Sequence, residues 1–248
     1  MQPILPVLDV MNGQVVRGIA GRRDEYRPLV SALTGSTKPL DVALAFRKHF
    51  GFDECYLADL DAIMHQRPAF DIYRELTAAG FQLWIDAGLH TSRDDTLVRL
   101  MEMRTAAIII GLESVDGPDE LRAIVDRAGA ANIVFSLDLK AGKPLSTASQ
   151  WGTDDPWQIA LHALDFGVRR LIVLDLARVG VGEGVGTDEL CVRLNQTHPK
   201  VQLIAGGGVR GIEDVTHLVQ CGVDRVLVAS ALHDGRILPD SRHSHVAD

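Results

Sequence analysis

The hydrophobic residues of this chain fall into eight short apolar runs, separated by longer segments in which apolar positions recur every three or four residues. The runs lie near residues 3–9, 54–59, 82–86, 107–111, 133–138, 170–175, 201–206 and 225–229. Short continuous apolar runs bounded by turn residues are typical of strands that are buried on both faces of a parallel sheet. The pattern therefore predicts eight buried parallel strands.

The segments between these runs have the spacing of amphipathic helices. The clearest examples are residues 40–50, 70–79, 96–103, 118–128 and 156–166. Glycines that suit a left-handed cap follow candidate helix ends at Gly51, Gly80, Gly167 and Gly222. Eight strand-then-helix units without a change of composition predict one α/β domain over residues 1–248, a (β/α)8 TIM barrel. A doubly wound open sheet is the alternative, but it does not explain the internal repeat.

The two halves of the chain repeat one pattern. Leu8-Asp9 ends one apolar run and Leu137-Asp138 ends another, and each Asp is followed four residues later by glycine. Three further pairs of strand ends recur in the same order, at an offset of about 120 residues. We therefore predict two half-barrels, about 1–130 and 131–240, followed by a polar C-terminal tail.

Composition and charge exclude several classes of protein. The hydrophobic content of 46% and the charged content of 23% are ordinary for a globular protein. No apolar run approaches the roughly 20 residues of a membrane span, and the N-terminus enters a strand without a signal-peptide pattern, so we expect a cytoplasmic protein. A net charge of −8 disfavours nucleic acid as a partner. Three cysteines without C-x-x-C spacing and nine histidines without ligand spacing predict no metal site, and we expect no cofactor.

Asp9 and Asp138 are the strongest candidates for chemistry. They end the first and fifth predicted strands, which lie opposite each other in an eight-stranded barrel. A substrate held between two such carboxyl groups can be protonated on one side and deprotonated on the other. A lone strand-end Asp is as often a helix cap. Of the other strand-end carboxylates, we expect Asp175 to contact substrate and the rest to orient loops.

A phosphate site is predicted after the seventh and eighth strands. Gly207 and Gly208 follow one strand, and Ala229 and Ser230 follow the next. Glycines let main-chain N–H groups approach a phosphate, and these two loops form the usual phosphate site of this barrel. The equivalent positions in the first half are Gly88 and Gly111. Their neighbours Asp86 and Glu113 bring negative charge, so this second site is predicted to be poor.

Four arginines lie close to the first strand. They are Arg17, Arg22, Arg23 and Arg27. The loop over residues 18–39 that carries three of them is longer than a barrel turn requires, and long loops at a barrel mouth often act as lids or clamps. We expect these arginines to bind an anionic ligand. The alternative is a solvated surface loop.

With these motifs in place, the chain resembles the histidine-biosynthesis barrel family over nearly its whole length. That family includes the isomerase that acts on phosphoribosyl-formimino-aminoimidazole carboxamide ribotide (ProFAR) and the cyclase subunit of imidazole glycerol phosphate synthase. The isomerase branch is the more similar, through Leu8-Asp9-Val10, Gly13 to Arg17, and Leu137-Asp138 with Trp151 downstream. The resemblance implies an Amadori rearrangement of an aminoaldose to an aminoketose, with Asp9 as general base and Asp138 as general acid. It also implies a small phosphorylated metabolite as the partner.

The chain departs from the isomerase pattern at several strand ends. It has Asp86-Ala87-Gly88 where the family has three glycines, Gly111-Leu112 where the family has Gly-Thr, and Ala229-Ser230 where the family has Gly-Arg. This pattern predicts a paralogue with an altered substrate. The loop over residues 21–27 is similar to isomerase-related proteins of methanogens and methylotrophs that use tetrahydromethanopterin. Two alternatives therefore stay open: an enzyme of tetrahydromethanopterin-linked one-carbon metabolism, and a non-catalytic ligand-binding barrel. The oligomeric state is not predicted.

Overall fold

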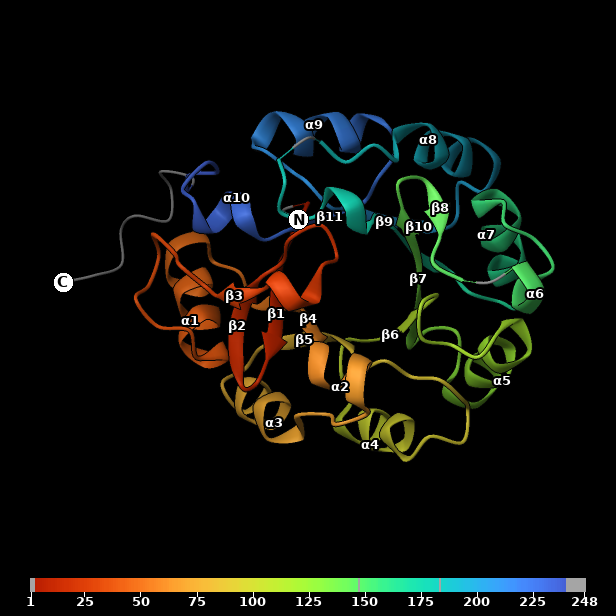
Figure 1. The fold of residues 1–248 in the computed structure, drawn as a ribbon, viewed down its shortest axis with the longest axis horizontal. Coiled ribbons are helices and arrows are strands. Elements are labelled where there is room, and N and C mark those ends of the chain that lie inside the picture. The colour runs from red at the N-terminus through yellow and green to blue at the C-terminus, as the bar shows by residue number, and fades with distance from the viewer. Residues whose placement is uncertain (1–2, 147, 183, 240–248) are drawn as a thin grey trace.

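The computed structural model describes residues 3–146, 148–182 and 184–239, and it contains a closed barrel of eight parallel strands (Figure 1). The barrel strands are β1 (Ile4–Met11), β4 (Glu54–Asp59), β5 (Gln82–Asp86), β6 (Ala107–Gly111), β7 (Ile133–Lys140), β9 (Arg170–Asp175), β10 (Gln202–Gly206) and β11 (Arg225–Val228). Pairing of β11 with β1 closes the ring. All eight predicted strands are confirmed to within a few residues, and so is the (β/α)8 fold.

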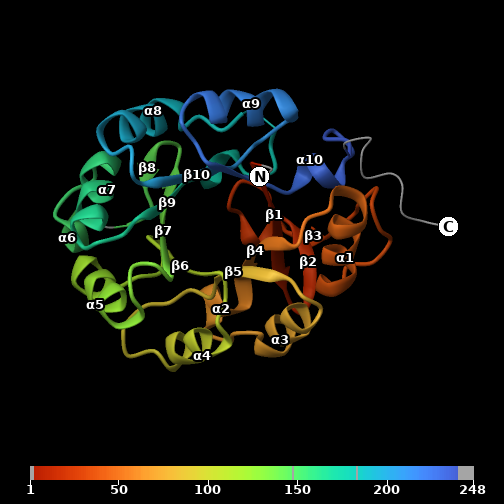
Figure 2. The same cartoon turned by 180° about the vertical axis from the view of Figure 1, so that it is seen from behind.

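Helices surround the barrel, as the views from both ends show (Figures 1 and 2). The longer ones are α1 (Pro39–Phe50), α3 (Phe70–Ala78), α4 (Asp95–Met103), α5 (Pro118–Ala128), α7 (Pro156–Asp165), α8 (Asp188–Thr197) and α9 (Ile212–Gln220). Short helical turns are η1 (Arg23–Glu25), α2 (Leu60–His65), α6 (Ala148–Trp151), η2 (Leu176–Arg178) and α10 (Ser230–His233). The predicted cap at Gly51 is confirmed, because this residue ends α1 with a φ of 72°.

Two hydrophobic cores hold the fold together. The larger one lies between the strands and the helices and includes Leu8, Phe46 and Leu57. The smaller one fills the inside of the barrel with residues such as Tyr56, Ile109 and Ile172. Successive side chains of a strand point to opposite faces, so each apolar run supplies both cores. The barrel is therefore packed, and open space is confined to its ends.

The half-barrel repeat is visible in two matching hairpins. β1 continues into an antiparallel pair with β2 (Gln14–Arg17), and β7 does the same with β8 (Lys143–Pro144). The turns between them also match: Asn12 and Gly13 have φ values of 52° and 75°, and Ala141 and Gly142 have values of 52° and 76°. Two consecutive residues with positive φ are the mark of a tight hairpin turn. A further short strand, β3 (Arg27–Pro28), pairs with β2.

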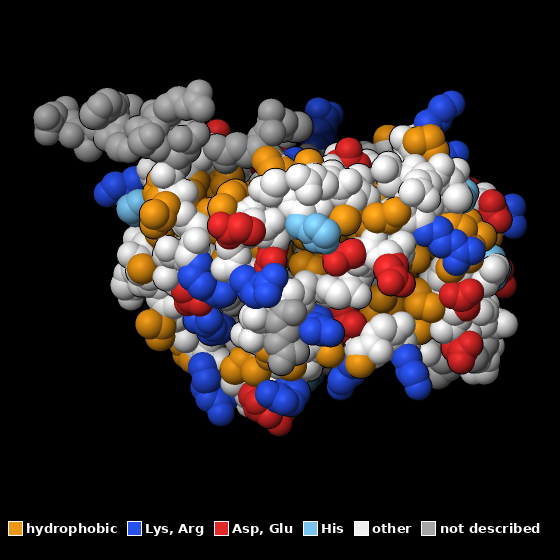
Figure 3. All heavy atoms as spheres, turned by 90° about the horizontal axis from the view of Figure 1, so that it is seen from above, with side chains coloured by type: hydrophobic (Ala, Val, Ile, Leu, Met, Phe, Trp, Pro, Cys, Tyr) orange, Lys and Arg blue, Asp and Glu red, His pale blue; other side chains and the backbone are white. Residues whose placement is uncertain are grey.

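The surface is mixed in charge on the face that Figure 3 shows. Acidic and basic side chains alternate there and do not gather into a patch of one sign. Over the described ranges, no helix has both the length and the apolar composition needed to cross a membrane.

Candidate active site

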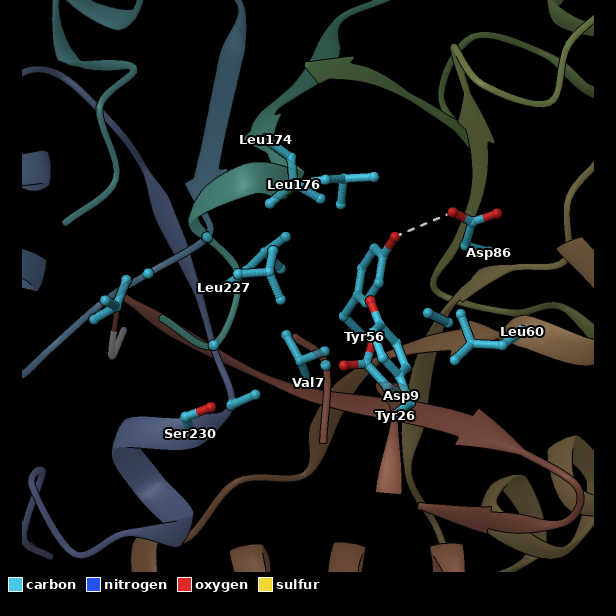
Figure 4. Close-up of a pocket in the computed structure, with 18 of the residues that line it drawn as sticks. Val7, Asp9, Tyr26, Tyr56, Leu60, Asp86, Leu174, Leu176, Leu227 and Ser230 are labelled. Atoms are coloured by element: carbon cyan, nitrogen blue, oxygen red, sulfur yellow. Dashed lines mark hydrogen bonds between the residues drawn. The ribbon is translucent and has the colours of Figure 1, made fainter. Parts of the chain in front are cut away.

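A cavity opens at the carboxyl ends of the barrel strands. Its volume is about 990 Å3, including the part that is open to solvent. Asp9, Asp86 and Asp138 line it from β1, β5 and β7, and Gly207, Gly208, Ala229 and Ser230 line it from the ends of β10 and β11. Figure 4 shows Ser230 across the cavity from Asp86, with Asp9 between them. The strand order places β1 and β7 on opposite sides of the barrel, so the two predicted acid–base groups face one cavity.

Asp9 lies close to the backbone of the loop that follows β2. A Cβ atom on Gly18 would stand 3.2 Å from the Asp9 Oδ2 and 3.5 Å from the Tyr26 hydroxyl, so glycine lets both groups come together. Burial raises the pKa of Asp9 to about 6, while the positive charge of Arg23 lowers it. Asp9 is therefore ionised at neutral pH and is close enough to its pKa to accept a proton.

Asp138 is the more deeply buried member of the pair, with an exposed fraction of 5%. Its Oδ1 accepts a hydrogen bond of 2.6 Å from the Ser136 hydroxyl, and its Oδ2 accepts a longer one of 3.5 Å from the main-chain N–H of Glu113. Burial first, and then the negative charge of Glu113, hold the pKa of Asp138 well above its usual range. This environment favours the protonated form of the Asp138 carboxyl group, which suits a general acid.

A third carboxyl group, Asp86, belongs to the same cavity. Its Oδ2 accepts a hydrogen bond of 3.2 Å from the Tyr56 hydroxyl, drawn in Figure 4, and its Oδ1 accepts one of 3.1 Å from the main-chain N–H of Gly88. Burial raises the pKa of Asp86 to about 7. The sequence places Asp86 at a strand end, but it does not reveal that this carboxyl group has a tyrosine partner.

An ion pair joins two sides of the cavity mouth. Arg23, in the loop between β2 and β3, pairs with Glu113, which follows β6. Both side chains are about one quarter exposed, with values of 25% and 24%. From the sequence, Glu113 was expected to be an uncompensated negative charge. The structure corrects this, because the Arg23 guanidinium compensates it.

The opposite side of the cavity is built from main chain. Gly207 and Gly208 both have positive φ, and the carbonyls of the preceding loop press against them. A Cβ on Gly207 would stand 2.8 Å from the Asp175 carbonyl, and one on Gly208 would stand 2.7 Å from the Gly184 carbonyl, so only glycine fits. Arg236, which pairs with Asp234 at 2.9 Å, adds a guanidinium to this side of the lining. The predicted second-half site is therefore compact and suited to an anion.

The first-half glycines are placed differently. Gly88 has a φ of 60°, and a Cβ there would stand 2.5 Å from the Ile63 Cα, so this glycine serves the packing of the strand end against α2. Gly111 lies under the acids: a Cβ there would stand 3.1 Å from the Asp138 Oδ2 and 3.8 Å from the Asp86 Oδ2. Neither glycine turn forms an open cradle for a phosphate.

Asp175 is directed away from the cavity. Its carboxylate accepts hydrogen bonds from the main-chain N–H groups of Ala141 (2.9 Å), Gly142 (2.8 Å) and Ala177 (3.0 Å). These contacts fix the hairpin turn after β7 and the start of η2. The expected contact of Asp175 with substrate is thus not supported, because its oxygens already bind main-chain groups.

Only one of the four predicted arginines lines the main cavity. Arg17 forms a two-pronged pair with Asp234 at 2.8 Å and borders a smaller neighbouring pocket. Arg22 pairs with Glu25 on the exposed surface of the loop, and Arg27 donates to the carbonyls of Asp24 and Tyr26. Of the four arginines expected to bind an anion, the structure thus places Arg23 alone in the lining of the main cavity.

Three polar residues of the cavity lining were not predicted from the sequence. They are Tyr26, Tyr56 and Arg236. Tyr56 lies in an apolar run, where its hydroxyl group is the only available signal. Burial raises the pKa of Tyr26 and that of Tyr56 well above the usual value, so both remain neutral phenols that can donate hydrogen bonds.

Comparison with known proteins agrees with this geometry. Residues 3–238 match the family described as histidine biosynthesis protein. An uncharacterized protein of Methanocaldococcus jannaschii is 31% identical over 232 residues, which cover 94% of this chain and 93% of that protein. The 1-(5-phosphoribosyl)-5-((5-phosphoribosylamino)methylideneamino) imidazole-4-carboxamide isomerases, the ProFAR isomerases, are more distant. The one from Chloroherpeton thalassium is 26% identical over 94% of this chain and 87% of its own length, and the one from Leuconostoc mesenteroides is 27% identical over 94% and 95%.

The match covers both halves of the barrel and every strand that contributes to the cavity. Family membership thus rests on nearly the whole length of the chain. This chain belongs to the histidine biosynthesis protein family.

Proposed function

We propose that this protein is an aldose–ketose isomerase that acts on an aminoaldose carrying a single phosphate. Asp9 and Asp138 support the reaction, because they face one cavity from opposite sides and burial raises the pKa of both. The observation that carries the proposal is this opposed pair. The ProFAR isomerases among its relatives are named for a reaction of this class.

The two carboxyl groups have complementary tasks in an aminoaldose rearrangement. Opening the sugar ring requires a proton on the ring oxygen, and Asp138 can supply it because burial and the charge of Glu113 raise its pKa and so favour its protonated form. Formation of the enol requires removal of the proton on C2, and Asp9 is ionised at neutral pH with a pKa of about 6. The neutral Tyr26 hydroxyl beside Asp9 is available to orient a ligand oxygen.

The two ends of the cavity differ in how well they can bind a phosphate. Gly207, Gly208 and Arg236 suit a phosphate at one end. Asp86, Asp138 and Glu113 surround the other end. Among the described residues each end has one lining cation, and both are paired: Arg236 with Asp234 and Arg23 with Glu113. The difference is that Glu113 itself lines the cavity, whereas Asp234 lies outside the lining. This asymmetry supports a ligand with one phosphate.

The second candidate function is an enzyme of tetrahydromethanopterin-linked one-carbon metabolism that acts on another phosphorylated ligand. It is favoured by the loop over residues 21–27, which is similar to isomerase-related proteins of methanogens and methylotrophs that use tetrahydromethanopterin. The acidic end of the cavity, which does not suit a second phosphate, is compatible with it. A substrate panel separates these two functions from isomerisation of ProFAR. Purified protein is offered ProFAR and a panel of singly phosphorylated aminoaldoses, and aminoketose formation is followed by NMR.

We expect the wild type to turn over a singly phosphorylated aminoaldose. We expect neither Asp9→Asn nor Asp138→Asn to show this turnover. We also expect failed or feeble rescue of a histidine auxotroph. A kcat/KM for ProFAR of about 10⁴ M⁻¹s⁻¹ or more would identify an ordinary ProFAR isomerase. No turnover of any aminoaldose, with retained binding of phosphorylated ligands, would instead favour the second candidate or a binding protein.

A further inference from the structure

The Arg23–Glu113 ion pair occupies a special place in the fold. Its two residues come from loops that follow β2 and β6, and β6 lies three strands from β1 in the barrel order. The pair therefore reaches across the mouth and does not join neighbours on one edge. Both residues line the cavity together with Asp86 and Asp138.

Arg23 is the only cation with which this end of the cavity can bind an anion, within the part of the chain that the structure describes. The described lining contains two positive side chains, and the other one, Arg236, lies near Gly182 at the opposite end, where it pairs with Asp234. The charge of Arg23 also reaches Asp9 and Asp86, since it lowers the pKa of both. Any ligand anion at this end would have to use Arg23.

We propose that Glu113 is a specificity-determining residue: its carboxylate occupies Arg23 in the position that a second phosphate of a ligand would otherwise take. The protein thereby selects ligands with one phosphate. This inference rests on the proposed function and names the residue responsible for its substrate class.

The charges around the pair explain why an external phosphate competes poorly. Glu113 is tethered to the barrel, so its local concentration at Arg23 is that of an intramolecular partner. A phosphate that displaced it would leave the Glu113 carboxylate without its cation next to Asp86, and side-chain atoms of both residues lie within 4 Å of the Cβ position of Gly111. Negative charges at close range in a partly buried site repel strongly. The ion pair and the Asp86 carboxyl group behind it thus act together against a second anion.

Glu113→Gln tests the inference without knowledge of the natural ligand. Crystals of the wild type and of the variant are soaked in the same concentration of inorganic phosphate. We expect the wild type to bind no anion at Arg23, and the variant to bind one there. The double variant Glu113→Gln with Arg23→Gln should lose this anion again.

Glu25→Gln is the matched control. Glu25 pairs with Arg22 at 2.9 Å on the same loop, but this pair is about half exposed and lies outside the cavity lining. The control changes the net charge by the same amount. It should leave the Arg23 end without an anion. If Glu25→Gln gains the anion too, the effect is one of net charge and the inference is wrong.

Calorimetry supplies a quantitative version of the test. The two ligands are ProFAR, which has two phosphates, and 5-aminoimidazole-4-carboxamide ribotide, the part of ProFAR that carries one of them. In the wild type we expect the two compounds to bind with similar affinity. In Glu113→Gln we expect ProFAR to bind about tenfold to hundredfold more tightly than in the wild type, the range for a hydrogen-bonded charged pair, with the smaller compound unchanged.

The outcomes separate the two proposals. A Glu113→Gln crystal with no anion at Arg23, or with Arg23 turned to Asp9, overturns the role of Glu113 whatever the enzyme's reaction is. An anion that appears at Arg23 in a protein that turns over no aminoaldose supports Glu113 and rejects the isomerase. Anion binding at Arg23 in the wild type overturns the inference directly.

Discussion

Replacing Asp86 with asparagine is expected to stabilise the protein at pH 8 while impairing its site. Asp86 is buried with an exposed fraction of 7%, and burial raises its pKa from 3.8 to about 7. A shift of about three units corresponds to roughly 4 kcal/mol of unfavourable free energy for the ionised folded state. Asparagine carries no charge and so avoids this cost.

The sign of the pH dependence follows from the direction of the shift. A raised pKa in the folded state means that the cost is absent below about pH 4, grows as pH rises toward 7, and is complete above 7. Asparagine can keep both hydrogen bonds, with its oxygen accepting from the Gly88 N–H and its amide donating to the Tyr56 oxygen. Allowing for imperfect geometry of these bonds, we expect a gain of about 2 kcal/mol at pH 8.

Urea unfolding at pH 4.5, 6 and 8, followed by tryptophan fluorescence and circular dichroism, measures this gain. The difference between variant and wild type should be small at pH 4.5 and largest at pH 8. Asp71→Asn is the control, because the Asp71 side chain is 99% exposed and its loss should change stability little at any pH. A variant that is less stable than wild type at pH 8, or a gain that is equal at all three pH values, would refute the reasoning.

Three further predictions concern the proposed reaction. Asp9→Asn and Asp138→Asn should each lower kcat by about 10²-fold to 10⁴-fold with little loss of stability. Single-turnover kinetics and unfolding curves measure these two effects, and near-normal turnover would contradict the roles of Asp9 and Asp138 as general base and general acid. Because Asp9 must be ionised and Asp138 protonated, kcat/KM should rise with pH through about 6 and fall again at higher pH, where Asp138 loses its proton. Arg23→Gln should move the rise to higher pH, since Arg23 lowers the pKa of Asp9, and Arg22→Gln should leave the profile unchanged. Gly207→Ala should weaken binding of inorganic phosphate, because the added Cβ would stand 2.8 Å from the Asp175 carbonyl oxygen and displace the loop. If calorimetry finds the same phosphate affinity in the variant and the wild type, the phosphate is not bound at Gly207.

Much of this protein is readable from local sequence pattern. Each barrel strand is buried on both faces, so its residues are apolar without alternation, and the eight runs stand out against amphipathic helices. Strand ends follow from the same pattern, which places Asp9 and Asp138 at the mouth. The glycines after β10 are recognisable because a close approach of main chain to main chain excludes every other residue at Gly207 and Gly208.

Tertiary structure decided which polar groups in the long loops meet. Four arginines near the first strand are equivalent as sequence, yet only Arg23 reaches the cavity, where it meets Glu113 from a loop 90 residues away. Asp175 ends a strand just as Asp138 does, but the hairpin turn after β7 supplies two N–H groups that bind its carboxylate. Strand burial depends on neighbours in the chain and is therefore local. The charge and pKa of the site depend on partners that only the closure of the barrel brings together.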